Sequence, residues 1–343
     1  MKTIFFTAIF ISSIFYAVAQ DVHFSQFNQT PLIINPALTG SGLGIHRAGL
    51  NYREQGTFFT KGYISYSAFY DGKYSFKKRT IKNKNSKQPY FGIGGVFIND
   101  RAGDSKMGTT NIGLSVAYFM ELIEKHVFSI GFQGSFGQRS IDYSDLRWDS
   151  QYINNSFSQN NPPEYLKPEE NFSYPDVATG ISWRYTKDRF FKSTAGIALH
   201  HVNSIKLRYL DVENQILDRK INIHGQAEYM FKSTVVTLIP SFLYQRQGKL
   251  QELVYGTLVK LQVNEKYQDS KFLESYVGLG LFNRHNDSFT ATLVISSKNT
   301  RIGINYDFNY SSLKRASNFK GAIETSVVFH IPYQKRRGGN TLI

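Results

Sequence analysis

Several residues of this 343-residue chain are of types that could do chemistry. His200 and His201 could bind a metal ion, but adjacent residues of a regular strand point to opposite faces and cannot both reach one ion. The glycine runs 92–95 and 278–280 lack the following helix and acidic residue of a dinucleotide site. No Ser and His pair with an orienting third group stands out. These patterns predict a protein that is not an enzyme and uses no metal or cofactor.

The first residues predict export from the cytoplasm. Lys2 is followed by an apolar run over 4–16, and Ala17-Val18-Ala19 has the small-x-small pattern of a cleavage site. We therefore expect a signal peptide over 1–19, cleaved after Ala19. A transmembrane anchor is the competing interpretation, but the run is shorter than the ~20 residues that a bilayer requires. The chain has no cysteine, which excludes disulfides, thiolate metal sites and lipidation at a cysteine.

The formal net charge of +14 has two local sources. Basic residues cluster in a segment near 73–87 and in a C-terminal tail, 332–343. These clusters are either solvated segments or a basic ring that meets acidic lipid headgroups or an acidic periplasmic partner. Nucleic acid is excluded as a partner because the chain is exported and carries no reading motif. The basic residues are Lys73, Lys77, Lys78, Arg79, Lys82, Lys84, Lys87, Lys335, Arg336 and Arg337.

The elements that must position all these residues are strands. The chain has 22 Tyr, 28 Phe and 27 Gly, and apolar residues alternate with polar ones along several segments. Over 301–310, for example, the even positions are Ile, Ile, Tyr, Phe and Tyr, while the odd positions are Arg, Gly, Asn, Asp and Asn. Such alternation also fits a soluble sandwich. The segments reach about 9 to 12 residues, however, which matches a tilted membrane-spanning strand.

The pattern predicts an all-β protein, a transmembrane antiparallel β-barrel of about 14 strands over 46–331, localised in the outer membrane. If the first strand runs outward, the connections near 139–175, 203–219 and 311–318 lie outside the cell, and the short ones near 121–125, 186–192, 232–233 and 298–299 lie in the periplasm. The basic segment and the tail would then face the periplasm. The long connections near 71–89 and 263–272 are exceptions on the periplasmic side, and a register shifted by one strand is the alternative. The expected strands are 46–55, 62–70, 90–100, 109–120, 126–138, 176–185, 193–202, 220–231, 234–246, 251–262, 273–284, 287–297, 300–310 and 319–331.

Charged residues at inward positions of these strands are candidate lumen-lining residues. One interpretation is a solvated, mutually paired lining, and the other is a set of side chains that clasp an inserted polypeptide. A barrel of this size is too wide for side chains alone to fill, so something must plug or gate it or a pore remains. The candidates are Arg47, Arg53, Arg184, Glu228, Arg284, Arg301, Asp307 and Glu324.

Residues 20–45 precede the first strand and are expected to be irregular, since Pro31 and Pro36 disfavour both a helix interior and a central strand. Its apolar residues Phe24, Phe27 and 32–34 would be costly to leave in water. We expect this segment either to pack against the periplasmic mouth or lumen of the barrel, or to pair as a lead-in strand at the rim.

The opening block, 23–40, resembles that of the PorP/SprF family of outer-membrane proteins of type IX secretion. The family pattern is an aromatic-Ser-Gln-aromatic, a Pro, and then Asn-Pro-Ala ending at a small residue, and each part is present in order. The residues that carry this resemblance are candidate family-motif and partner-contact residues. They are Phe24, Gln26, Phe27, Pro31, Asn35 and Pro36.

Weaker matches in the same order extend the resemblance over nearly the whole expected mature chain. They include 49–55, a Gly-rich strand over 92–103, 196–201, 239–241, 304–313 and 322–326. One departure is the basic tail, because many relatives end in Cys-Pro-x-aromatic. Any role that the family gives to its tail is therefore in doubt here.

The resemblance implies a non-enzymatic role. Members of this family look like partners of large secreted adhesins with a C-terminal sorting domain, which they help to deliver to or hold at the cell surface. Some are linked to gliding motility and others to periplasmic components of the secretion machinery. The alternative is an outer-membrane transport channel for small or hydrophobic solutes with an N-terminal hatch. A stable complex with a secreted protein would favour the first, and flux through liposomes would favour the second.

Overall fold

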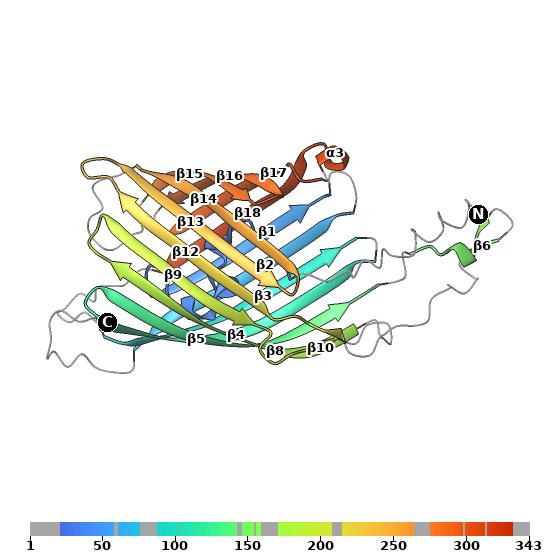
Figure 1. Ribbon diagram of the computed structural model, residues 1–343, viewed down its shortest axis with the longest axis horizontal. Coiled ribbons are helices and arrows are strands. Elements are labelled where there is room, and N and C mark those ends of the chain that lie inside the picture. Colours follow the sequence, from blue (N-terminus) through green and yellow to red (C-terminus); the bar gives the residue numbers. More distant parts are fainter. Residues whose placement is uncertain are drawn as a thin grey trace, which may run out of the picture.

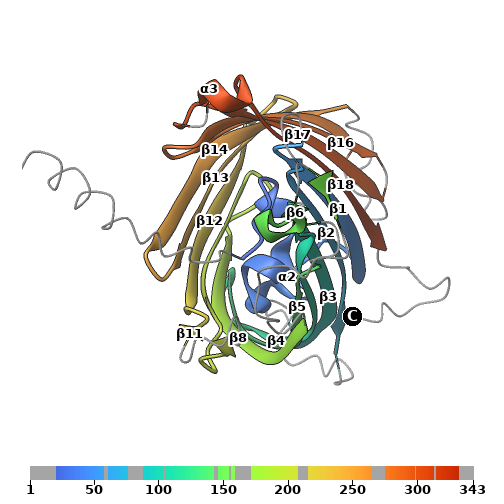
Figure 2. The same ribbon diagram turned by 90° about the vertical axis from the view of Figure 1, so that its right-hand side faces the viewer.

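The computed structural model describes residues 21–57, 61–75, 88–103, 105–142, 146–153, 156–158, 171–207, 215–263, 275–297, 299–312 and 314–331. In this part of the chain, fourteen antiparallel strands close into one barrel, in the order β1-β18-β17-β16-β15-β14-β13-β12-β9-β8-β5-β4-β3-β2 (Figures 1 and 2). The predicted fold class and strand number are therefore confirmed. The expected signal peptide and tail lie outside the described residues.

The barrel strands are longer than those of most soluble sheets, and most of their ends fall within a few residues of the expected ones. They are β1 (His46–Gln55), β2 (Tyr63–Tyr74), β3 (Tyr90–Ala102), β4 (Met107–Ile123), β5 (His126–Ser140), β8 (Asn171–Thr186), β9 (Phe191–His200), β12 (Lys220–Met230), β13 (Val236–Gln247), β14 (Leu250–Gln262), β15 (Tyr276–Arg284), β16 (Ser288–Ser297), β17 (Thr300–Asn309) and β18 (Lys320–Ile331).

The first and last strands pair along their full length, from His46 opposite Ile331 to Gln55 opposite Ala322. Closure matters because a sheet edge in hydrocarbon would leave backbone N–H and C=O groups without partners. The outer surface is apolar: Leu50 is 63% exposed, and Leu114 and Leu281 are 75% exposed. An exposed band of this kind is stable only against lipid, so the sequence alternation and the exposure pattern describe a membrane-spanning barrel.

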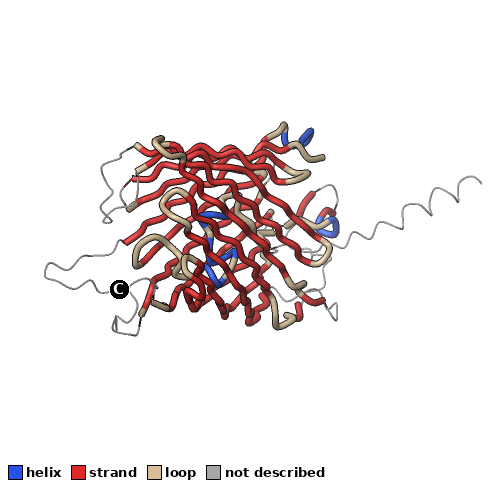
Figure 3. Tube along the Cα trace, turned by 60° about the vertical axis from the view of Figure 1, so that its left-hand side comes forward, coloured by secondary structure: helices blue, strands red, loops and turns tan. Residues whose placement is uncertain are grey.

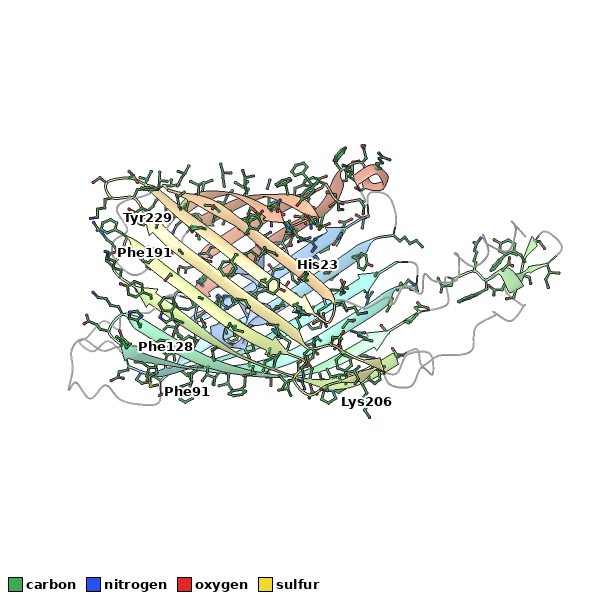
Figure 4. All side chains as sticks on the ribbon, in the orientation of Figure 1. His23, Phe91, Phe128, Phe191, Lys206 and Tyr229 are labelled. Carbon is green, nitrogen blue, oxygen red and sulfur yellow. The ribbon has the colours of Figure 1, made fainter. Side chains whose placement is uncertain are left out.

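Aromatic side chains gather at one rim of this band. Phe91, Phe128, Phe191 and Tyr229 lie near the same end of the barrel (Figure 4). Phe91 packs on Tyr118 with their ring centroids 5.0 Å apart. Aromatic girdles at the membrane-water interface are typical of outer-membrane-type barrels.

The two ends of the barrel differ, and we name them by their connections. The loop end is where β1 ends. It carries the connections 56–62, 141–170, 201–219 and 310–319 and the short turns 103–106, 248–249 and 285–287. The tail end is where β1 begins and β18 ends. It carries the short turns 124–125, 187–190, 231–235 and 298–299 and two longer connections, 75–89 and 263–275. In Figure 1 the loop end is on the right and the tail end on the left.

Small elements decorate the loop end. They are η3 (Asp149–Gln151) with the hairpin β6 (Tyr152–Ile153) and β7 (Ser156–Phe157), the hairpin β10 (Lys206–Leu207) and β11 (Gln215–Ile216), and α3 (Lys314–Ser317). These elements were not expected from the sequence. None of the helices in the described ranges is long and apolar enough to span a membrane.

Residues 21–45 lie inside the barrel, and we call this segment the plug. It contains three short helical turns, η1 (Phe27–Gln29), α2 (Pro31–Ile34) and η2 (Pro36–Leu38). Figure 2 looks along the barrel and shows α2 enclosed by the strands, and Figure 3 shows the helical turns within the strand wall. The plug is not a lead-in strand at the rim, because its helical turns contact the inner wall rather than pair with an edge.

Candidate functional site

The plug begins at the loop end, where Ser25 and Gln26 are held by acidic residues of the wall. Glu324 accepts hydrogen bonds from the backbone N–H groups of Ser25 at 2.7 Å and Gln26 at 2.9 Å. The Ser25 hydroxyl donates to Asp307 at 2.8 Å. Ser326 donates to the side-chain oxygen of Gln26 at 2.6 Å. One carboxylate thus caps two neighbouring backbone donors of an otherwise irregular segment.

Two arginines complete this arrangement. Arg53 lies 3.1 Å from Asp307 and 3.2 Å from Glu324, and it donates to the Ser25 hydroxyl. Arg284 donates to the same hydroxyl at 2.8 Å and lies 3.8 Å from Asp307. We call Arg53, Arg284, Asp307 and Glu324 the clamp. All four are at most 4% exposed. Buried charges are tolerated when they are paired and hydrogen-bonded, as these are, and the bonds fix the Ser25-Gln26 dipeptide.

Apolar side chains anchor the plug on either side of the clamp. Phe27 packs edge-on against Phe282, with ring centroids 6.1 Å apart, in a buried cluster that also contains Ile34. Leu32 is fully buried in a second cluster, against Phe69 and the wall residues Val96 and Val328. Burying these side chains stabilises the plug inside a lumen that is otherwise polar.

The middle of the plug is the Asn35-Pro36-Ala37 turn. The Asn35 side chain accepts from the backbone of Ala37 at 2.8 Å and donates to the carbonyl of Ile181 at 3.0 Å. Its amide also lies 3.0 Å from the His224 ring. Gly180 makes this contact possible, because a Cβ there would overlap the Asn35 side chain. The turn is therefore fixed by its own cap and by a wall that has no side chain in its way.

The plug leaves the lumen at the tail end. Gly40 donates its backbone N–H to Asp71 at 2.6 Å, and Arg47 holds the same carboxylate through two nitrogens at 2.9 and 2.6 Å. Arg184 donates to the carbonyl of Ser41 at 3.1 Å. The segment thus runs the length of the lumen, starting at the loop end and reaching β1 at the tail end.

The first residues of the plug meet a second group of charges at the loop end. His201 lies 2.7 Å from Asp21 and 3.0 Å from Asp176, and Lys220 lies 3.8 Å from Asp21. Burial lowers the pKa of His201, but the two carboxylates outweigh burial and raise it to about 9. Burial raises the pKa of Asp21, but His201 and Lys220 bring it well below its usual range. The pair is therefore ionic at neutral pH.

The pKa of His23 is shifted in the opposite direction to that of His201. His23 lies 3.7 Å from Glu252, which raises its pKa, but burial and the neighbouring Arg284 and Arg53 lower that pKa to about 3. His23 is therefore neutral at physiological pH, and it lies inside the barrel (Figure 4).

The expectation that His200 and His201 point to opposite faces was wrong. β9 ends at His200, and His201 adopts a left-handed backbone conformation with φ of 58°. Both side chains are buried, with ring centroids 6.4 Å apart. His200 lies 3.3 Å from the carbonyl of Ile34, so each histidine contacts the plug. Within the described residues, no group of three or more His, Cys, Asp and Glu side chains could hold a metal ion.

A cavity of about 680 Å³ remains between the plug and the wall formed by β1, β8, β9 and β12–β18. It extends along the plug from near Phe27 to the tail end. Its charged lining residues are Arg47, Arg184, Lys192, Glu228, Lys260 and Arg301. Apolar residues of the plug and of the wall complete it.

The eight candidate lumen residues all lie on the inner side of the barrel, in two groups. Arg53, Arg284, Asp307 and Glu324 meet at the clamp, while Arg47, Arg184, Glu228 and Arg301 line the cavity. Sequence reasoning did not single out Asp21, Asp71 or Asp176, although Asp71 and Asp176 lie at inward positions of β2 and β8. It considered His201 only as a possible metal ligand. It also missed that the plug starts at the loop end.

The six candidate motif residues are all in the plug and buried against the wall. Phe24, Gln26 and Phe27 are each 5% exposed, and Asn35 is fully buried. Pro31 and Pro36 are the first residues of α2 and η2. Their contacts in this structure are with the barrel, and contact with an outside partner stays a prediction. Of the basic clusters, Lys73 contacts the Tyr90 ring at 5.7 Å, whereas the other members lie outside the described residues.

Comparison with solved structures finds other barrels. The CymD monoaromatic hydrocarbon channel has a TM-score of 0.47 at 8% identity, covering 94% of this chain and 96% of its own. A Pseudomonas aeruginosa FadL homologue has 0.45 at 9%, covering 88% and 94%. The Pseudomonas putida toluene transporter TodX has 0.45 at 8%, covering 88% and 92%. No curated protein matches the chain.

The family comparison is decisive by its extent. The model of the type IX secretion system membrane protein PorP/SprF matches residues 17–329, which include the plug and nearly all of the barrel. The segment Phe24 to Phe27, which the clamp holds, and the Asn35-Pro36-Ala37 turn both lie in the matched range. The chain belongs to the PorP/SprF family of type IX secretion system membrane proteins.

Proposed function

We propose that this protein is an outer-membrane partner of type IX secretion that helps to deliver or anchor a large secreted adhesin at the cell surface. It would do so by binding the adhesin's C-terminal sorting domain. The same anchoring role would serve gliding motility, and periplasmic components of the secretion or gliding machinery would be further partners. The chain would reach the membrane after cleavage of a signal peptide behind Ala19.

The observation that carries this proposal is the fixed plug. A solute channel needs a path through its lumen, and opening one here would pull Ser25 and Gln26 away from Glu324 and Asp307. That movement would leave buried charges with fewer partners, which is strongly unfavourable. A barrel whose lumen is filled in this way supports binding at its ends, where buried area and complementary hydrogen bonds are sufficient for a stable complex.

Affinity capture tests the proposal. The protein, tagged at its tail, is isolated from gently solubilised outer membranes, and a barrel of another family tagged in the same way is the control. We expect a secreted protein to be recovered through its C-terminal domain, and that domain, once purified, to bind the purified barrel. Recovery of a correctly folded barrel alone, judged by heat-modifiable gel mobility, together with no binding of secreted C-terminal domains, would contradict it.

One observation favours a channel as the second candidate function. The cavity of about 680 Å³ beside the plug is in the size range of small-molecule sites. If the plug acts as a hatch, that cavity would be part of a path for small or hydrophobic solutes. Flux through purified protein in liposomes distinguishes this candidate from the anchor.

A further inference from the structure

The cavity has an excess of positive charge. Five cationic side chains line it, namely Arg47, Arg184, Lys192, Lys260 and Arg301, and Glu228 is the one acidic lining residue among those described. Asp71 adds one more carboxylate behind Arg47. Five cations therefore face two acids. At the clamp, by contrast, two arginines face Asp307 and Glu324, so the charges there are balanced.

The partners of the cavity cations show where the excess lies. Arg47 forms an ion pair with Asp71 at 2.6 Å, and Lys260 forms one with Glu228 at 3.4 Å. Arg301 has no acidic partner among the described residues, and its buried Nε has no hydrogen-bond partner there. Lys192 likewise has no ion pair in the described part of the chain. A buried donor without a partner is costly, so an anionic ligand at this position would be stabilised.

The cavity is also partly apolar. Leu38 of the plug and Ile239 and Leu258 of the wall line it together with Tyr276. Two cations lie over the Tyr276 ring. The Lys260 ammonium is 4.6 Å and the Arg301 guanidinium 5.7 Å from the ring centroid. A ligand that combines carboxylates with apolar side chains fits this lining, whereas inorganic phosphate would use only the charges.

Access to the cavity is through a barrel mouth. The wall is hydrogen-bonded all the way round, so a lipid in the bilayer cannot enter sideways. The cations lie near the tail end: Arg184 is close to the end of β8, Lys192 to the start of β9 and Arg301 to the start of β17. The two longest connections, 141–170 and 201–219, are at the opposite end, although 75–89 and 263–275 at the tail end are also long. The two longest connections favour an extracellular loop end, so the tail end would face the periplasm, from which a secreted chain arrives.

We propose that this cavity binds an acidic peptide segment with apolar side chains, which enters at the tail end and pairs with Lys192 and Arg301. This inference rests on the proposed function and names the contact that a partner polypeptide would make. The volume of about 680 Å³ accommodates a few residues rather than a folded domain. Binding would be sensitive to salt, since much of it is electrostatic.

The test uses the full-length barrel in detergent and a fluorescent hexapeptide of alternating glutamate and leucine. Fluorescence anisotropy gives the Kd for wild type, for the double variant Lys192→Gln/Arg301→Gln, and for a glutamine-leucine peptide of the same length. We expect the double variant and the neutral peptide each to bind about tenfold more weakly or worse. Lys125→Gln is the matched control, because Lys125 is exposed in a turn at the same end and does not line the cavity.

Three outcomes would overturn the proposal. If the acidic peptide binds wild type and a folded double variant equally well, it binds outside the cavity. Competition by acetate or phosphate at the peptide's own concentration would identify a free small anion as the ligand. If the acidic peptide does not bind wild type, the cavity is not a peptide-binding site. If the double variant still captures the secreted protein, the anchor proposal stands and only the cavity assignment fails.

Discussion

At the scale of single residues, the clamp concentrates the interactions that fix the plug. Glu324 is 1% exposed, accepts two backbone N–H groups and pairs with Arg53. Because a buried carboxylate with several donors stabilises whatever carries those donors, Glu324 links the last strand of the barrel to the first residues of the plug. Removal of the Glu324 carboxylate would therefore affect both the last strand of the barrel and the first residues of the plug.

Glu324→Gln tests this link. The amide keeps the shape of the side chain but removes the charge that balances Arg53, so we expect a loss of about 1–3 kcal/mol in the free energy of unfolding. Urea unfolding of the barrel in detergent measures it, with Glu124→Gln in an exposed turn as the control. A Glu324→Gln barrel as stable as the control would show that the clamp does not hold the plug.

His201 predicts a pH dependence. Its pKa is raised from 6.5 to about 9 in the folded protein, because Asp21 and Asp176 outweigh burial. A raised pKa contributes stability that is complete below about pH 6.5 and is lost as the pH rises through about 9. The urea midpoint of wild type should therefore fall over this window more steeply than that of His201→Gln. Parallel profiles for the two proteins would contradict the assignment.

The inward positions of the charged residues could be predicted, but their pairing could not. Alternation along a strand places Arg53, Asp307 and Glu324 on the inner face, since residues two apart share a face. Their partner Ser25 is 299 positions from Glu324, and no local pattern encodes such a contact. The same limit explains why the contacts of His201 with Asp21 were missed.

At the scale of elements, the strands were predictable because their period of two extends over whole strands. β1 was expected at 46–55 and occupies His46–Gln55. β8 was expected to begin at 176 but begins at Asn171 and includes Pro175. The two-residue strands of the loop-end hairpins are too short to show a period. The turns of the plug were expected only as irregular structure. Prolines indicate where a helix or strand is disfavoured, but they do not specify the course of the backbone there.

Gly180 offers a test of how the plug fits the wall. A Cβ at Gly180 would overlap the Asn35 side chain, whereas a Cβ at Gly134 on the outer face would meet nothing within 4 Å. We expect Gly180→Ala to destabilise the barrel by about 1–3 kcal/mol through this overlap and Gly134→Ala to have little effect. Thermal shifts in gel mobility compare the two. Equal shifts would mean that the Asn35 turn is not packed on β8.

At the scale of the whole molecule, the loop end carries the two longest connections, 141–170 and 201–219, and the aromatic rim marks one membrane interface. In outer-membrane barrels, long loops are extracellular and short turns periplasmic. If this barrel follows that rule, the plug starts at the outer face, runs through the lumen and ends at the periplasmic face. This orientation places the cationic cavity toward the periplasm.

The absence of cysteine makes this orientation directly measurable. His285→Cys places a thiol in an exposed turn at the loop end, and Glu124→Cys places one in an exposed turn at the tail end. A membrane-impermeant maleimide should label the first on intact cells, and the second only after the outer membrane is permeabilised. The reverse pattern would invert the barrel and remove the periplasmic access on which the cavity proposal depends.

The central claim is that the plug closes the barrel and that the protein acts as a binding scaffold. Release of a small dye from liposomes containing the purified barrel tests it most directly. Asn28→Cys and Ser241→Cys, whose native side chains lie 3.3 Å apart, allow the plug to be linked to the wall with a short thiol cross-linker. We predict release no faster than from empty liposomes, linked or unlinked. Steady release from the unlinked barrel that stops on linking would show that the plug is a moving hatch and would contradict the account.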